Sequence, residues 1–315
     1  MSRYDALLIV SFGGPEKRED VIPFLENVLR GRNVPHERML EVAEHYYHFG
    51  GRSPINDQNR ALIEALRPVV KIPIYWGNRN WHPMLADTVR RMRDDGIQHA
   101  VAFVTSAFGS YSGCRQYIED IARARAEARE GAPRITKIRP FSDHPKFIQA
   151  MTDRVRAALA ELPQGRLVFT AHSVPVSMAG SSPYVGELEL ACAAVAKGVG
   201  REQWKLVYQS RSGPPTQPWL EPDIGTYLRE TRSDVVIVPI GFLSDHMEVI
   251  YDLDTEARAV CEELGVKMVR AGTAGMHPAM IEMIAEMVHQ EHAVCAEGCC
   301  PAPQRPATRP PVRPT

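Results

Sequence analysis

A histidine and a row of carboxylates are the residues whose types and spacing could do chemistry together. His172 follows a short apolar run, and three carboxylates stand four residues apart further along, namely Glu248, Asp252 and Glu256. At that spacing the carboxylates share one helix face, where like charges destabilise the helix. Imidazole and carboxylate groups suit divalent cations, and an imidazole can also accept a proton near neutral pH. The pattern predicts a path for a divalent cation that leads away from His172.

These residues also have ordinary structural explanations. A histidine at a strand end is more often a hydrogen-bonded structural residue. Asp245 lies three residues before Glu248, the spacing of a capping box at a helix start. The first basic residue after Glu248 is Arg258, so the row lacks the interleaved Lys and Arg of a solvated face. Because no Lys or Arg side chains neutralise the carboxylates within the row, a functional interpretation of the row stays open.

Cysteines form the second unusual pattern. Three of the six fall within six positions near the C-terminal end, as Cys295-x-x-x-Cys299-Cys300, just beyond the last expected helix. Packing calls for no such cluster there. Cys192 and Cys261 lie inside amphipathic stretches and are expected to be small core residues.

Composition and charge narrow the class of protein. The chain has 315 residues, 44% hydrophobic and 24% charged, with a formal net charge of -1. This is ordinary globular composition, and the charge gives no field that favours nucleic acid or an anionic membrane. The apolar run at 6–10 is too short for a signal peptide, and no stretch reaches the roughly 18 apolar residues of a membrane helix. We expect a cytoplasmic protein with reduced thiols and no transmembrane segment.

Short apolar runs alternate with longer amphipathic ones, the pattern of parallel sheets with crossover helices. Strands are expected at 6–10, 72–75, 101–105, 135–138, 167–170, 206–208, 235–239 and 266–269. Helices are expected near 16–29, 57–68, 83–94, 115–130, 145–161, 187–199, 221–231, 247–264 and 278–292. The fold class is α/β, with two Rossmann-like domains, each a four-stranded parallel sheet flanked by helices.

The domain boundary is expected near Pro140. The first domain covers 1–140 and the second 141–276, and a C-terminal helix at 277–293 packs back on the first domain. The cysteine segment is 294–300. The proline-rich stretch 301–315 has no apolar periodicity and is expected to be disordered.

Ligands of open α/β sheets bind beyond the carboxyl ends of the strands. Three such ends carry candidate residues: Ala171-His172-Ser173, the run from Ile240 to Glu248, and Ser11-Phe12-Gly13-Gly14-Pro15. We therefore expect these three loops to meet at one cleft.

Several motifs resemble those of ferrochelatases. The histidine motif is Thr170-Ala171-His172-Ser173-Val174-Pro175, and the second signature is Gly241-Phe242-Leu243-Ser244-Asp245-His246-Met247-Glu248. Tyr208-Gln209-Ser210, Pro218-Trp219-Leu220-x-Pro222 and Phe49-Gly50-Gly51-x-Ser53-Pro54 match as well, in order over about 4–290. The resemblance implies the chelatase fold and insertion of ferrous iron into a porphyrin in haem biosynthesis. Two further stretches look most like the actinobacterial-type branch, which favours coproporphyrin III over protoporphyrin IX, namely 11–15 and 45–51.

The resemblance also implies roles for individual residues. His172 is expected over the ring centre as base or metal-passing ligand, with Glu248 facing it. Asp245 and His246 would orient the site, and Glu248, Asp252 and Glu256 would relay the cation or the released protons.

The same resemblance implies residues that contact the porphyrin. Ser53, Arg79, Tyr111 and Trp219 match positions of the porphyrin site. Arg30 and Arg32 could meet propionates through charge-assisted hydrogen bonds. The alternatives are a solvated loop for the arginines and core packing for Trp219. Some relatives have Tyr or Met at the position of Phe12, where these side chains can approach the metal. Phenylalanine has no lone pair to donate to a metal, so Phe12 is expected to act by packing.

For the cysteines, the resemblance implies a [2Fe–2S] cluster held by Cys114, Cys295, Cys299 and Cys300, since four thiolates are the usual complement. A zinc site with the same thiolates or free thiols on a frayed tail are the alternatives.

Competing functions are a cobalt or nickel chelatase of the same fold and a non-catalytic tetrapyrrole or metal carrier. A metallohydrolase lacks support, because no His-Glu-x-x-His motif is present. The expected partners are a porphyrin and ferrous iron.

Overall fold

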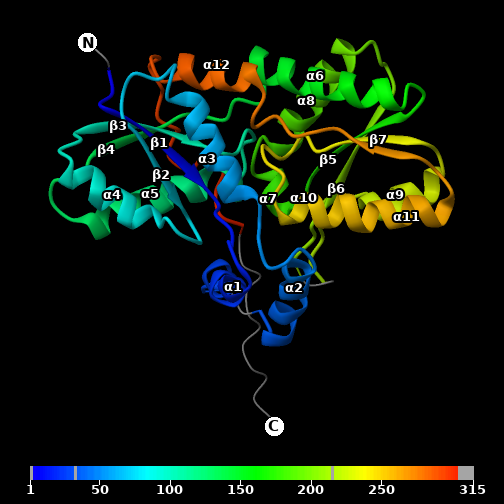
Figure 1. Cartoon of the computed structure of the whole chain (residues 1–315), viewed down its shortest axis with the longest axis horizontal. Helices are drawn as coiled ribbons and strands as arrows, with labels where there is room; N and C mark the ends of the chain where they lie inside the picture. Colours follow the sequence, from blue (N-terminus) through cyan, green and yellow to red (C-terminus); the bar gives the residue numbers. More distant parts are fainter. Residues whose placement is uncertain (1–2, 32–33, 214–215, 304–315) are drawn as a thin grey trace, which may run out of the picture.

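Eight strands form two separate parallel sheets of four strands each in the computed structural model, which describes residues 3–31, 34–213 and 216–303 (Figure 1). The first sheet has the order β2-β1-β3-β4 and the second the order β6-β5-β7-β8. The strands of the first sheet are β1 (Ala6–Ser11), β2 (Ile74–Asn78), β3 (His99–Val104) and β4 (Arg134–Lys137). Those of the second are β5 (Arg166–His172), β6 (Trp204–Gln209), β7 (Val235–Val238) and β8 (Met268–Arg270). The predicted fold class is confirmed, with the same strand order in both halves.

Both faces of each sheet are covered by helices, because the strands carry apolar side chains on both faces. In β1, Leu7 and Ile9 enter one apolar cluster while Leu8 and Val10 enter another. Helices α4 (Leu85–Asp94) and α5 (Gln116–Ala128) cover the outer face of the first sheet. Helices α9 (Ile224–Thr231) and α11 (Arg258–Leu264) cover the outer face of the second.

One apolar cluster runs between the inner faces of both sheets. It includes side chains of α3 (Ile55–Leu66), α6 (Pro145–Glu161), α8 (Tyr184–Gly198) and α12 (Pro278–Met287). Helices α6 and α12 lie along one side of the molecule, while α1 (Val21–Leu29) and α2 (His36–His48) project from the other (Figure 1). In α12 the salt bridges of Glu282 and Glu286 to Lys146 of α6 join it to the second half. The division at Pro140 stays a prediction.

The structure adds elements that the periodicity did not predict. Helix α2 and the short α7 (Val176–Gly180) were missed, and α12 ends at Met287 rather than near 292. The structure is helical throughout the expected helix at 247–264. Its hydrogen bonding changes along the way, however, because a π-helical turn, η3 (Asp252–Ala257), lies between α10 (Met247–Tyr251) and α11. A second π turn, η2 (Tyr111–Arg115), precedes α5, and a short 3-10 turn, η1 (Arg18–Asp20), precedes α1. Of the expected disordered tail, 304–315 lies outside the described residues.

The strand order identifies where each half can hold a ligand. In the first sheet β1 lies between β2 and β3, and in the second β5 lies between β6 and β7. The crossover connections therefore run to opposite sides of the sheet from β1 and from β3, and likewise from β5 and from β7. Loops after the strands at such a point diverge and leave room for a ligand. The four loops concerned begin at Phe12, Thr105, Ser173 and Pro239. Within the described ranges no helix is long and apolar enough to cross a membrane.

Candidate active site

His172 is the last residue of β5, and its ring is fixed in one orientation. Its Nδ1 lies 2.5 Å from the carbonyl oxygen of Ser173. A carbonyl oxygen can only accept, so Nδ1 carries a proton and donates it. The Tyr184 hydroxyl donates to the His172 carbonyl at 3.0 Å and holds the backbone. In the neutral ring the Nε2 lone pair is therefore free to take up a proton or bind a metal ion.

Glu248 of α10 faces that nitrogen, with 3.5 Å between His172 Nε2 and Glu248 Oε1. Burial lowers the pKa of His172, but the Glu248 carboxylate, together with the Ser173 carbonyl and Asp252, outweighs this effect and leaves that pKa raised. Burial raises the pKa of Glu248, yet His172 outweighs it and lowers that pKa to about 2. The side chains keep 30% and 48% of their surface exposed, so water reaches a pair that protein otherwise surrounds. Each group thus stabilises the charged form of the other.

Asp252, one turn further along, is the carboxylate that titrates near neutrality. Burial and the charges of Glu248 and Glu256 together raise its pKa to about 7, against the hydrogen bond from Ser210 and the charge of His172, which lower it. Asp252 Oδ2 accepts from the Ser210 hydroxyl and, at 3.4 Å, from Gln209 Nε2. Burial also raises the pKa of Glu256. The carboxylate row is thus electrostatically connected, and it passes through a π turn, a feature frequent at functional sites.

Asp252 predicts a specific dependence of stability on pH. Its pKa is raised on folding, so between about pH 4 and about pH 7 the native state keeps a proton that the unfolded state has lost. The free energy of unfolding then falls as pH rises through this window, by at most ~1.4 kcal/mol for each step of one in pH. Asp252→Asn should have nearly wild-type stability at pH 4 and exceed it at pH 8. Urea unfolding at both pH values measures this, and equal differences at the two would contradict it.

The capping-box interpretation of Asp245 and Glu248 is wrong. The residue before α10 is His246, no side chain caps the helix, and the Asp245 carboxylate instead accepts from Arg270 Nη1 at 2.8 Å. Arg270 also holds Asp254 of η3 through two hydrogen bonds. The His246 ring lies 3.9 Å from Glu248 Oε2, and burial lowers its pKa. Asp245 and His246 both belong to the loop that sets the position of Glu248.

Helix α2 contributes a side chain that the sequence analysis did not single out. Burial raises the pKa of Tyr46, and the charges of Glu248 and Asp252 raise it as well, so this phenol lies within the electrostatic range of both carboxylates. His45 of α2 stacks on Tyr251 of α10 with 3.8 Å between ring centres. The first half therefore closes over the carboxylate row. The motif containing Tyr46 was visible in the sequence, but no helix was predicted there.

Gln209 and Ser210 were also missed as site residues. Gln209 is buried and donates to the Glu248 carbonyl oxygen at 2.7 Å. Ser210 has a φ of 61°, in the left-handed region that a non-glycine residue rarely adopts. Such strain often marks functional sites, and here it accompanies the hydrogen bond from Ser210 to Asp252. The motif named both residues without indicating this contact.

Among the residues expected to contact porphyrin, Arg79 is mostly buried and paired with a carboxylate. It is 9% exposed, with Nε 2.5 Å from Asp120 Oδ2 in an ion pair that is not a well-directed hydrogen bond. Its guanidinium lies over the rings of Tyr117, at 4.5 Å, and Phe12, at 5.8 Å. Arg79 therefore supports Phe12, which also packs edge-on against Phe24.

Ser53 is likewise buried, and its N–H donates to the Pro15 carbonyl at 2.9 Å. A Cβ on Gly14 would lie 2.7 Å from the Ser53 Cβ, so glycine is required for this close approach. Tyr111 donates to Glu119 at 3.0 Å. Leu220, next to Trp219, donates its N–H to Val174 in the loop after His172.

The two arginines of the α1–α2 loop are not equally defined. Arg30 is exposed at the end of α1, and its guanidinium donates to Asn27 Oδ1. Arg32 lies outside the described residues.

The four cysteines of the predicted cluster come near one another. Cys114 is buried in η2; burial raises its pKa, Lys137 lowers it, and Cys295 and Cys299 act on it electrostatically. The Sγ atoms of Cys299 and Cys300 are 3.6 Å apart, and the positive φ of Cys300, 51°, turns the chain there. Across 3–31, 34–213 and 216–303, however, no three His, Cys, Asp or Glu side chains are close enough to hold a metal ion. This finding covers both the cysteines and the carboxylate row.

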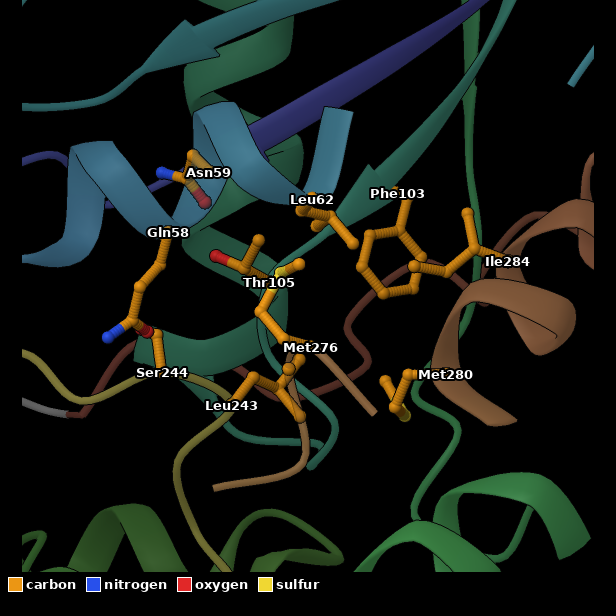
Figure 2. A pocket seen from close by; sticks show the side chains of 11 residues that line it. Gln58, Asn59, Leu62, Phe103, Thr105, Leu243, Ser244, Met276, Met280 and Ile284 are labelled. Atoms are coloured by element: carbon orange, nitrogen blue, oxygen red, sulfur yellow. The ribbon is translucent and has the colours of Figure 1, made fainter. Parts of the chain in front are cut away.

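A small cavity of about 20 Å³ lies between the two halves beside this site (Figure 2). It is lined mainly by apolar side chains, and neither His172 nor Glu248 lines it. Gln58 and Asn59 of α3 form one wall, and Leu243 and Ser244 of the loop before Asp245 form another.

Sequence comparison places this geometry in a known family. The family model described as ferrochelatase matches residues 4–292. The ferrochelatase of Rhodopirellula baltica is 52% identical, over 96% of this chain and 95% of its own length. The coproporphyrin III ferrochelatase of Mycobacteroides abscessus is 47% identical, over 95% of this chain and 93% of its own. That of Streptomyces coelicolor is 46% identical, with coverages of 96% and 94%.

Solved structures agree on the fold. The sirohydrochlorin chelatase SirB from Bacillus subtilis, in complex with cobalt, superimposes with a TM-score of 0.54 at 13% identity, over 90% of this chain and 92% of its own. At that identity the likeness concerns the fold alone. The predicted resemblance and fold are both confirmed.

Proposed function

Because this chain belongs to the ferrochelatase family, we propose that His172 and Glu248 carry its iron insertion step and that coproporphyrin III is its porphyrin. The observation that carries the first part is the contact of 3.5 Å between an imidazole with one free nitrogen and a carboxylate. Both stand at the carboxyl ends of neighbouring strands, where open sheets bind ligands.

Insertion of iron exchanges two pyrrole N–H protons for one Fe²⁺, so the site must take up two protons. His172 Nε2 accepts the first, because its Nδ1 proton is held by Ser173. Glu248 stabilises the imidazolium that forms. Asp252, with a pKa of about 7, accepts the second and passes it toward Glu256. Phe12, Tyr111 and Trp219 form walls against the macrocycle, with Arg79 packed against Phe12 and Ser53 close to Gly14 in the same loop as Phe12.

The preference for coproporphyrin III rests on the names of the relatives and on one structural feature. Six relatives between 47% and 51% identical carry that name. Coproporphyrin III has four propionates, and the exposed guanidinium of Arg30 at the end of α1 is a candidate partner for one of them. We expect kcat/KM for iron insertion to be at least about tenfold higher for coproporphyrin III than for protoporphyrin IX, a difference of ~1.4 kcal/mol. Anaerobic steady-state assays with both porphyrins measure it, and a preference for protoporphyrin IX would reject the substrate assignment.

We further propose that Cys114, Cys295, Cys299 and Cys300 hold a [2Fe–2S] cluster. Support comes from the donor set and from its spacing. Two thiolates about 2.3 Å from one tetrahedral metal ion are about 3.8 Å apart, close to the 3.6 Å between Cys299 and Cys300. Electrostatic contact of Cys114 with the thiols of the 295–300 segment agrees with one shared site. When bound, the cluster would supply one-electron chemistry and fix this segment to the first half.

The cluster can be tested by colour and composition. Protein purified without oxygen should be reddish-brown and contain about two irons and two sulfides per chain, and Cys114→Ser should lose both. A matched control is Cys192→Ser, since Cys192 is buried in α8 away from the other thiols. Zinc in place of iron would favour the alternative site, and protein without metal would remove the cluster.

A further inference from the structure

Gln58 of α3 joins the first half of the molecule to the loop that carries the carboxylate of the site. Its Oε1 accepts from the backbone N–H of Asp245 at 3.0 Å, and its Nε2 donates to the carbonyl of the same residue at 3.4 Å. The second bond is the longer and weaker one. The side-chain amide of Gln58 thus binds both the backbone N–H and the backbone carbonyl of Asp245. Figure 2 shows the side chain extending from α3 to the loop beside Ser244.

The other anchors of this loop come from its own half. The Asp245 carboxylate binds Arg270, and the Leu243 carbonyl accepts from the Gly275 N–H at 2.8 Å. These contacts fix the loop to the second sheet. Gln58 fixes it relative to the first half, which supplies Phe12, Tyr111 and Tyr46.

The start of α10 has no side-chain cap and is held by this loop and by Gln209, which donates to the Glu248 carbonyl. His246 precedes the helix without capping it, and Glu248 follows two residues later. The separation of Glu248 from His172 is already 3.5 Å, so a small outward shift breaks the contact. Misplacement by about 1 Å can lower a rate about a hundredfold.

The Gln58 side chain holds this loop by hydrogen bonds, in addition to the packing of Leu243 in the core. Leu243 of the loop, with Met276 and Met280, lines the cavity beside Gln58 (Figure 2). A partly buried amide bonded to a backbone is worth about 1 kcal/mol per bond and leaves unpaired groups when removed. Loss of Gln58 therefore frees the loop without collapsing a core.

We propose that Gln58 is a positioning residue for iron insertion, which holds Glu248 opposite His172 by fixing the Asp245 backbone to the first half. The proposal rests on the function assigned above. It concerns the geometry between the two halves, so it affects the rate of insertion more than the binding of porphyrin.

The test compares Gln58→Met, which keeps the length but makes no hydrogen bond, with Gln98→Met. Gln98 is exposed and its side chain donates only to the Gly96 carbonyl, far from the site, so it is a matched control. Gln58→Met should lower kcat about tenfold while KM for porphyrin stays within about twofold, the result for an interaction made in the transition state. Its Asp245 amide should exchange with solvent at least about tenfold faster than in wild type.

A kcat equal to that of the control, or unchanged exchange at Asp245, would overturn the proposal. If Gln58→Met does not fold, Gln58→Asn carries the test, because it keeps the amide but is too short to reach Asp245. A wild-type protein that inserts no iron would refute the assigned function, whereas the exchange measurement would still report on the Gln58 contact.

Discussion

His172→Ala should fold normally and lose iron insertion by a factor above about a hundred, the range for removal of a positioned acid–base group. The variant removes the nitrogen that faces Glu248 and leaves the Tyr184 hydrogen bond to the backbone carbonyl intact. Its thermal midpoint is therefore expected to stay near that of wild type. Multiple-turnover insertion assays under nitrogen measure the loss. Near-normal turnover by His172→Ala would remove His172 from the mechanism.

Glu248→Gln should lower the plateau rate at least about tenfold, because the imidazolium that forms on proton transfer loses its counter-charge. It should also move the pH profile. Among the groups that raise the pKa of His172 against burial, Glu248 has the largest effect, so that pKa falls when glutamine replaces it. His172 then stays neutral to lower pH, and the acid limb of the kcat/KM profile shifts toward acid. An unchanged acid limb would contradict the electrostatic coupling of the two residues. Glu262→Gln, on α11 outside the carboxylate row, is a suitable control.

Sequence patterns predicted the fold well because both sheets consist of strands that are apolar on both faces. Each of the eight expected strands overlaps a strand of the structure. Helix α2 escaped prediction because only Met39 and Ala43 of its thirteen residues are buried, which leaves little apolar periodicity. Most of its remaining surface faces solvent or the site, so its position depends on contacts such as His45 with Tyr251.

Parts of the site were predictable because spacing alone puts Glu248, Asp252 and Glu256 on one helix face. The π turn that interrupts this helix could not be read from residue types. The ion-pair partner of Arg79 was equally hidden, since Asp120 lies 41 positions away and becomes a neighbour only when the loop after β2 meets α5. For the same reason the sequence could not show that Asp245 binds Arg270 instead of capping α10. These contacts join residues from different elements, which one sequence does not reveal.

The central claim is that this protein catalyses iron insertion rather than binding tetrapyrrole. Its most direct measurement follows the fluorescence of coproporphyrin III under anaerobic conditions with excess ferrous iron and a small amount of protein. We predict that the fluorescence disappears over many turnovers, with the absorption bands of the iron product appearing in proportion. Loss of fluorescence that stops at one porphyrin per chain, or turnover that needs cobalt or nickel instead of iron, would contradict the account.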